Sequence, residues 1–162
     1  MTEALFETER LFARKLEAGD IPALFEVYGD ADAMRYVGDG SAITMAECVE
    51  WVEVTHRNYA ARGYGMFALC DKASAKVLGF AGIVHPGSQP EPEVKYALRR
   101  SAWGRGLATE AVRGLLAYGG SLGLKRIIAT VHEHNGPSQR VMEKCGLLFV
   151  ERDGTTLVYA SG

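Results

Sequence analysis

The stretch from Trp103 to Ala111, which reads WGRGLATEA, has the residue types of an anion-binding turn. Gly104 and Gly106 follow an extended apolar segment and lead straight into an amphipathic helical pattern. The first N–H groups of a helix have no intrahelical acceptor, and the helix dipole places partial positive charge beside them. Because glycine has no Cβ, a ligand can approach this main chain closely, and a phosphate group suits such a site.

Two side chains strengthen this interpretation, and two alternatives stay open. Arg105 adds a positive charge at the rim of the turn, and Thr109 adds a hydroxyl one helical turn further on. Alternatively, the two glycines only shape a connection. A Gly-x-Gly pair before a helix is also found in dinucleotide-binding oxidoreductases, with an acidic residue such as Glu133 after the next strand. Against that class, Thr109 stands in place of the third glycine, and too few residues follow Gly106 to complete a doubly wound sheet.

The histidines and cysteines give little support for a metal site. His132 and His134 would share one face of an extended chain, but no third and fourth ligand follow at a convincing spacing, so we expect no metal. The three cysteines form no CxxC pair, and each lies within an apolar pattern. Buried thiols are therefore expected, rather than a disulfide or a metal site, at Cys48, Cys70 and Cys145.

Length and composition predict one ordinary globular domain that spans residues 1–162. The chain is 48% hydrophobic and 23% charged, as is typical of soluble proteins. Its 18 Lys and Arg against 20 Asp and Glu give a net charge of −2, which argues against direct nucleic-acid binding, although a local basic cluster stays open. Residues 1–20 contain no apolar signal-peptide segment, and no run of about 18 apolar residues occurs, so we expect a cytoplasmic protein with no membrane partner.

Hydrophobic periodicity and breaker residues divide the first half of the chain into a strand, two helices and loops. Asp20 before Ile21-Pro22 has the form of a helix N-cap, and Thr44 with Glu47 has the form of a capping box. The expected elements are a strand at 10–16, a helix from Asp20 to Gly29, a short turn or helix at 30–37, a loop at 39–41 and a long helix from Thr44 to Gly63.

The second half alternates strands and helices. Two strands at 66–70 and 77–85 are joined by a polar turn and form an expected antiparallel hairpin, and in the strand at 93–98 Val94, Tyr96 and Leu98 share one face. After the glycine turn we expect a helix at 108–122 closed by Gly123, a strand at 126–131, a helix from Asn135 to Gly146 and a final hairpin of 147–152 with 155–159. The predicted fold class is mixed α/β.

These residues resemble the GNAT acetyltransferases, specifically the RimJ/RimL type, over nearly the whole chain. The resemblance is carried by Trp103 to Ala111, by the strand EVKYAL at 93–98, by Asn135-x-x-Ser138 and by EKCGL at 143–147. The family's pyrophosphate signature is Gln/Arg-x-x-Gly-x-Gly/Ala. Gly106-Leu107-Ala108 matches its end, whereas Trp103 replaces the Gln or Arg, as is familiar in the RimJ/RimL branch.

The resemblance implies a GNAT fold, in which a central, mostly antiparallel, twisted sheet splays open at its middle strands and carries helices on both faces. Acetyl-CoA, as co-substrate, would lie in the split between residues 94–98 and 126–131. Its pantetheine arm would bond to the main chain of Tyr96, Ala97 and Leu98 and to Asn135, and its sulfur would lie near Ser138. Its pyrophosphate would meet the turn formed by Trp103, Gly104, Arg105, Gly106, Leu107, Ala108 and Thr109.

The implied chemistry needs a base and a proton donor. A primary amine must be neutral to attack the thioester carbonyl, and the departing thiolate must receive a proton. The resemblance implies Glu93 as the base, directly or through water; the alternatives are that Glu93 is a solvated carboxylate near Glu91, or that His85 serves instead. The tyrosine that the family usually carries one turn after Ser138 is Met142 here, so Ser138 or water must protonate the thiolate.

The acceptor is an amine that the sequence does not identify. The resemblance points to a protein or peptide N-terminal α-amine, which attacks directly in a ternary complex; its pKa of about 8 keeps it neutral more often than a lysine amine with a pKa near 10.4. A small amine, an amino-sugar antibiotic and a non-catalytic acyl-CoA-binding module are the alternatives. Tyr36, Trp51 and Tyr59 could line an acceptor pocket, although packing in the core is the simpler role. The oligomeric state stays open, with a homodimer as one option.

Overall fold

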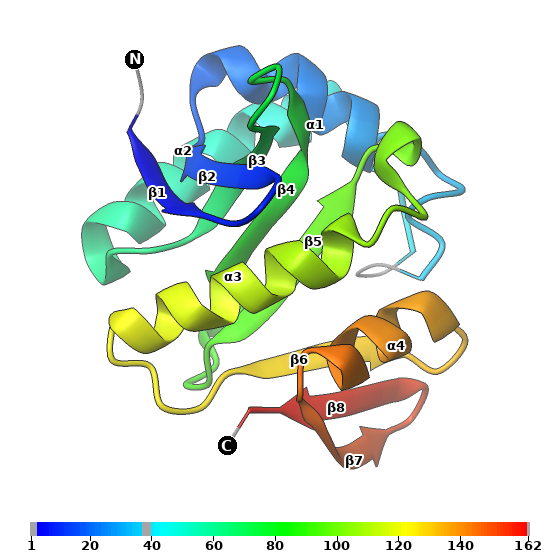
Figure 1. Cartoon of the computed structure of the whole chain (residues 1–162). Helices are drawn as coiled ribbons and strands as arrows, with labels where there is room; N and C mark the ends of the chain where they lie inside the picture. The colour runs from blue at the N-terminus through cyan, green and yellow to red at the C-terminus, as the bar shows by residue number, and fades with distance from the viewer. Residues whose placement is uncertain (1–2, 37–39, 162) are drawn as a thin grey trace.

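The structure, a computed structural model, describes residues 3–36 and 40–161. Within these residues one sheet has the strand order β1-β2-β3-β4-β5-β6-β8-β7, with four α-helices packed around it (Figure 1). The strands are β1 (Ala4–Glu7), β2 (Leu11–Lys15), β3 (Met66–Asp71), β4 (Val77–Val84), β5 (Glu93–Leu98), β6 (Ile128–His132), β7 (Leu148–Asp153) and β8 (Thr156–Ala160). The helices are α1 (Ile21–Tyr28), α2 (Met45–Arg62), α3 (Leu107–Ser121) and α4 (Gly136–Lys144), with 3₁₀ turns at Ala18–Asp20, Pro86–Ser88 and Arg100–Ala102.

The pairing of the strands confirms the predicted splayed sheet. Every neighbouring pair is antiparallel except β5 and β6, which run parallel and share a single registered pair, Glu93 with Ile128. Beyond this pair the two strands separate, and α3 supplies the crossover that a parallel connection requires. The mostly antiparallel order also excludes the doubly wound sheet of the oxidoreductase alternative.

Two separate cores hold helices on both faces of the sheet. Residues of α1 and α2 pack with one set of sheet side chains, among them Leu24, Val27, Cys48, Val52, Ala68 and Phe80. Residues of α3 and α4 pack with the other set, among them Leu69, Ile83, Leu107, Val112, Leu115 and Met142. Side chains of a strand alternate between faces, so Ala97 of β5 contacts the first core while Val94 and Leu98 lie in the second.

Capping residues and glycines in the sequence predicted most ends of helices and strands to within about two residues. The capping box is confirmed, because Thr44 Oγ1 accepts from Glu47 N–H over 3.1 Å and Glu47 Oε1 accepts from Thr44 N–H over 3.0 Å. Gly63 ends α2 with a left-handed φ of 85°. Strand β1 was not predicted, and β6 begins two residues later than expected, at Ile128. Residues 31–36 form turns. Val37, in the predicted 30–37 segment, and Asp39, in the predicted 39–41 loop, lie outside the described residues.

Asp20 is the N-cap of α1 by position, but its predicted capping role is wrong. Its side chain makes no cap hydrogen bond to α1. Both carboxylate oxygens instead accept from the guanidinium of Arg14, each over 2.8 Å, and the residue is buried. The pairing with Asp20 raises the pKa of Arg14, against the opposing effect of burial. Asp20 therefore ties the end of β2 to the start of the first helix.

Strand β7 forms one edge of the sheet and is exposed along its whole length. Leu148, Phe149 and Val150 all contribute apolar surface there, with Leu148 72% exposed. The register shift between Phe149 and Glu151 interrupts the usual alternation of faces at this point.

Among the described residues, no helix has the length and apolar character needed to cross a membrane.

We predict that Asp20→Ala costs about 3 to 5 kcal/mol of unfolding free energy, because it leaves the half-buried Arg14 guanidinium without its partner. Thr44→Ala, which removes a true cap, should cost only about 1 kcal/mol and serves as the control. Chemical denaturation followed by circular dichroism measures both. Equal, small losses in the two variants would mean that Asp20 acts as an ordinary cap.

Candidate active site

Strand β5 presents backbone groups along the split in the sheet. Ile128 N–H donates to Pro92 C=O over 2.9 Å, so the backbone groups of Pro92 point toward β6. The direction of these groups alternates from one residue to the next along a strand. The even-numbered residues of β5 therefore also direct their N–H and C=O groups toward the β6 side. Since β6 leaves after Ile128, Tyr96 and Leu98 face the split, whereas Ala97 faces β4. An extended ligand with amide groups can pair with such an edge as an added strand.

The predicted phosphate turn has the backbone geometry that its glycines allow. Gly104 and Gly106 have φ values of 72° and 75°, in the left-handed region, and Gly106 is the N-cap of α3. Gly106 has no side chain that could cap the first N–H groups of α3, so a ligand can bind to these groups in its place. The observed turn therefore fits the diphosphate of a coenzyme A molecule.

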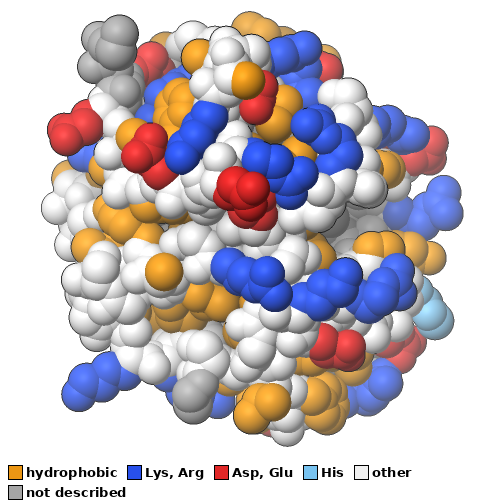
Figure 2. Space-filling model, viewed as in Figure 1, with side chains coloured by type: hydrophobic (Ala, Val, Ile, Leu, Met, Phe, Trp, Pro, Cys, Tyr) orange, Lys and Arg blue, Asp and Glu red, His pale blue; other side chains and the backbone are white. Residues whose placement is uncertain are grey.

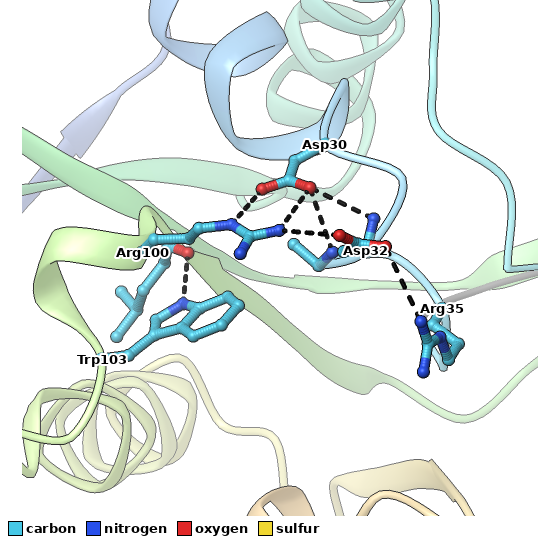
Figure 3. A network of polar contacts seen from close by, with 7 residues as sticks. Asp30, Asp32, Arg35, Arg100 and Trp103 are labelled. Carbon is cyan, nitrogen blue, oxygen red and sulfur yellow. Dashed lines mark hydrogen bonds and ion pairs between the residues drawn. The ribbon is translucent and has the colours of Figure 1, made fainter.

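Trp103 and Arg100 fix the segment that leads into this turn (Figure 3). Trp103 Nε1 donates to Leu98 C=O over 2.8 Å, so the carbonyl of Leu98 is already bonded within the protein. The Arg100 guanidinium lies over the Trp103 ring and binds the Asp30 carboxylate. This hydrogen bond lowers the pKa of Asp30 to about 2. The turn after α1 is thereby joined to the segment before α3, and Asp32 adds a longer contact of 3.6 Å to Arg100.

Glu93 lies at the last point where β5 and β6 pair, and it is only 2% exposed. Its Oε2 accepts from the Thr130 hydroxyl and from the Lys95 ammonium, both over 2.7 Å, and its Oε1 accepts from the Gln89 side-chain amide over 3.2 Å. The alternative of a solvated carboxylate is therefore wrong. A carboxylate offers about four acceptor positions, so the three donors leave Glu93 one position at which it can receive a further proton.

His85 is held by hydrogen bonds at both ring nitrogens. Its Nε2 is 2.7 Å from the Tyr64 hydroxyl, and its Nδ1 is 2.9 Å from the backbone carbonyl of Gln89. A carbonyl can only accept, so Nδ1 carries a hydrogen, and in the neutral ring Nε2 then accepts from the Tyr64 hydroxyl. Both ring nitrogens are thus used to hold the loop that precedes Glu93.

The Tyr96 side chain contacts Ser138, a contact that the sequence did not predict. Its hydroxyl donates to Ser138 Oγ over 3.0 Å, across the split from β5 to α4. Burial raises the pKa of Tyr96, partly offset by the bond to Ser138, so the phenol stays protonated. Asn135 caps α4 by accepting from Ser138 N–H over 3.2 Å, and Met142 is buried in the core. The sequence predicted a role only for the backbone of Tyr96. Because Tyr96 shares a face of the strand with Val94 and Leu98, this alternation is the signal from which a role of its side chain could have been predicted.

A cavity of about 380 Å³ lies between the turn after α1 and the start of α4, lined by Asp32, Ala33, Arg35, Tyr36 and Asn135. Tyr36 is exposed and stacks on His132, with ring centroids 4.7 Å apart. The other two aromatic candidates belong to the core. Trp51 packs edge-on against Tyr28, and the Tyr59 hydroxyl bonds to backbone groups of β3 and of the segment after β2.

Charge favours an anionic ligand on the face that carries α3 and α4. Figure 2 shows a row of Lys and Arg side chains across the middle of the molecule, at the level of these two helices in Figure 1. The local cluster exists although the net charge of the chain is −2. Glu133 forms an ion pair with Arg152, and its other carboxylate oxygen lies 3.6 Å from His134 Nε2. The site thus combines an open strand edge, a glycine turn and a basic surface.

Comparisons with known proteins agree with this geometry. The family model described as an acetyltransferase (GNAT) domain matches residues 10–148. The uncharacterised N-acetyltransferase p20 of Bacillus licheniformis is 30% identical over 148 residues, which cover 87% of this chain and 83% of that protein. The structure of a GNAT-family acetyltransferase from Bacillus anthracis has a TM-score of 0.80, with 27% identity over 96% of both chains.

RimL, described as a ribosomal-protein α-N acetyltransferase and solved in complex with coenzyme A, has a TM-score of 0.79. It is 16% identical, and the match covers 98% of this chain and 97% of that one, so this likeness concerns the fold alone. The family match and the p20 relative cover most of the chain, including the strand, the turn and the α4 residues that surround the split. On these grounds the chain belongs to the GNAT acetyltransferases.

Proposed function

We propose that this acetyltransferase transfers an acetyl group from acetyl-CoA to a protein or peptide N-terminal α-amine, by direct attack in a ternary complex. The observation that carries the proposal is the separation of β5 from β6 after one pair, with the glycine turn of α3 following β5. The open edge at Tyr96 and Leu98 supports binding of the pantetheine arm, and Gly104 and Gly106 support binding of the pyrophosphate.

In this mechanism the group that accepts a proton and the groups that donate one lie on opposite faces of β5. Glu93 and Lys95 extend from one face, whereas Tyr96 extends from the other toward Ser138. The amine nitrogen bonds to the thioester carbon, the C–S bond breaks, and the amine proton passes to Glu93 directly or through water. The thiolate takes the hydroxyl proton of Ser138, whose oxygen already accepts from the Tyr96 phenol and can be reprotonated by it.

The cavity beside Asn135 is our candidate for the acceptor site. It is open to solvent, and Asp32, Arg35 and Tyr36 supply both charges and an aromatic wall, which suits a peptide backbone with a charged end. The likeness to the fold of RimL supports the assignment to the RimJ/RimL type.

The alternative acceptor is a small amine or an amino sugar. Mass spectrometry of peptide and small-amine mixtures after incubation with acetyl-CoA would separate the two classes, and no product in either would favour an acyl-CoA-binding module.

We also propose a cytoplasmic location, where acetyl-CoA is made available to such enzymes. A homodimer is proposed through the exposed apolar edge strand β7, since an unpaired edge can add a strand from a second copy. Sedimentation of the protein with and without Phe149→Lys would test this assembly.

We predict that acetyl-CoA raises the melting temperature by about 5 to 10 °C at a hundredfold excess over its dissociation constant, because binding to the folded state alone stabilises it. NADH should produce no shift. Differential scanning fluorimetry with both ligands makes the comparison. A shift with NADH and none with acetyl-CoA would overturn the cofactor assignment.

The phosphate turn is tested by Gly106→Ala, with Gly123→Ala at the other end of α3 as a matched control. Both glycines have positive φ, so each substitution should cost about 1 to 2 kcal/mol of stability. Neither added Cβ meets a neighbour closer than 3.4 Å. Only Gly106→Ala should also weaken acetyl-CoA binding, by roughly tenfold, because its Cβ lies where the diphosphate approaches the main chain. Equal affinities in the two variants, measured by calorimetry, would make Gly106 purely structural.

The proton transfers are tested by Glu93→Gln and Ser138→Ala, assayed from about pH 6 to 9.5 with one acceptor. Glu93→Gln should lower kcat/KM by roughly 10²-fold, and the loss should shrink as pH rises because the amine then deprotonates unaided. Ser138→Ala should lower kcat with little relief at high pH, since the thiolate still needs a proton. Wild-type rates for Glu93→Gln at every pH would remove the glutamate from the mechanism.

A further inference from the structure

The turn between β1 and β2 is bonded to the start of α3. Thr8 Oγ1 donates to Glu110 Oε2 over 2.5 Å, and the backbone N–H of Arg10 donates to the same oxygen over 2.7 Å. The Arg10 side chain donates from Nε to Glu110 Oε1 over 2.8 Å. Both carboxylate oxygens of Glu110 are therefore held by a turn that lies 100 residues earlier in the sequence.

Arg10 also reaches the phosphate turn itself. Its Nη1 donates to the backbone carbonyl of Arg105 over 2.9 Å, and Arg105 lies between the two left-handed glycines. Its Nη2 lies beside Gly106, 3.6 Å from the position that a Cβ would take. Within the described part of the chain, no hydrogen bond uses Nη2. The guanidinium thus fixes one peptide of the turn and keeps donors free next to it.

The charge of Glu110 explains why an arginine is needed there. Glu110 lies in the first turn of α3, where a carboxylate would repel a bound diphosphate. Burial acts to raise the pKa of Glu110, but the hydrogen bonds from Thr8 and Arg10 outweigh it and lower the pKa, so the group is ionised at neutral pH. The guanidinium of Arg10 neutralises this carboxylate and presents its remaining N–H groups toward Gly106.

We propose that Arg10 is a positioning residue for the diphosphate of acetyl-CoA: it orients the turn at Arg105, compensates Glu110 and offers Nη2 to a phosphate oxygen. This inference rests on the proposed function, because it takes the turn at 104–109 as the diphosphate site. It adds the β1–β2 turn, which no motif in the sequence had connected with the cofactor.

The test compares two acetyl donors in Arg10→Met: acetyl-CoA, and S-acetylpantetheine, which lacks the phosphates. Calorimetry should find acetyl-CoA binding weakened by about tenfold to a hundredfold, the range expected for a lost charge-assisted hydrogen bond, with S-acetylpantetheine binding unchanged. Arg152→Met is the matched control, because Arg152 is similarly exposed, at 53% against 43%, and pairs with Glu133, which is not part of the turn. It should change neither affinity.

A double variant separates charge compensation from simple support of the fold. Arg10→Met with Glu110→Gln should recover part of the lost acetyl-CoA affinity, because the uncompensated carboxylate is gone. Equal weakening for both donors, or no recovery in the double variant, would mean that Arg10 only stabilises the fold and would overturn the inference. A wild-type protein that binds S-acetylpantetheine but gains nothing from the phosphates would also overturn it, whereas failure to bind either donor would overturn the proposed function.

Discussion

The separation of β5 from β6 after a single pair is the constraint on which the rest of the structure depends. Interrupting a sheet in its middle leaves N–H and C=O groups without partners, and each such group costs about 1 to 3 kcal/mol when it is shielded from water. The protein satisfies one of them itself, since the Trp103 indole binds the Leu98 carbonyl. The others form a strand edge that an amide-containing ligand can complete. We propose that the pantetheine arm of acetyl-CoA binds along this edge. The glycine turn follows in the chain, between the end of β5 and the start of α3.

The alternation of side chains along β5 follows from the same constraint and separates incompatible chemistry. Glu93 and Lys95 lie on one side of the split with Thr130, while Tyr96 lies on the other with Ser138. A base and an acid on the same face could exchange a proton with each other. In the mechanism that we propose, the sheet lies between these two groups, and each exchanges a proton with a different atom of the reacting molecules. The separation requires only that successive residues of one strand point in opposite directions.

Sequence reasoning succeeded where the signal was local and failed where it was not. The capping box at Thr44, the glycine turn before α3 and the hairpins each depend on a few adjacent residues, and the structure has all of them. Asp20 had the right position but a different partner, because Arg14 competes for its carboxylate. The bonds of Arg10 to Glu110 and of Tyr96 to Ser138 join residues 100 and 42 positions apart. Periodicity carries no information about such pairs, so they appear only once the strand order is known.

During synthesis, strands β1 to β5 leave the ribosome before β6 exists. These five strands are paired in chain order, so they can form a sheet as they emerge, with β5 as its temporary outer edge. Such an edge can join to the same strand of another nascent chain. Helix α3 follows within a few residues and covers one face, but β6 pairs with β5 only at Glu93. The edge that we propose as the binding site of acetyl-CoA is therefore, on a polysome, a place where aggregation can begin until a ligand covers it.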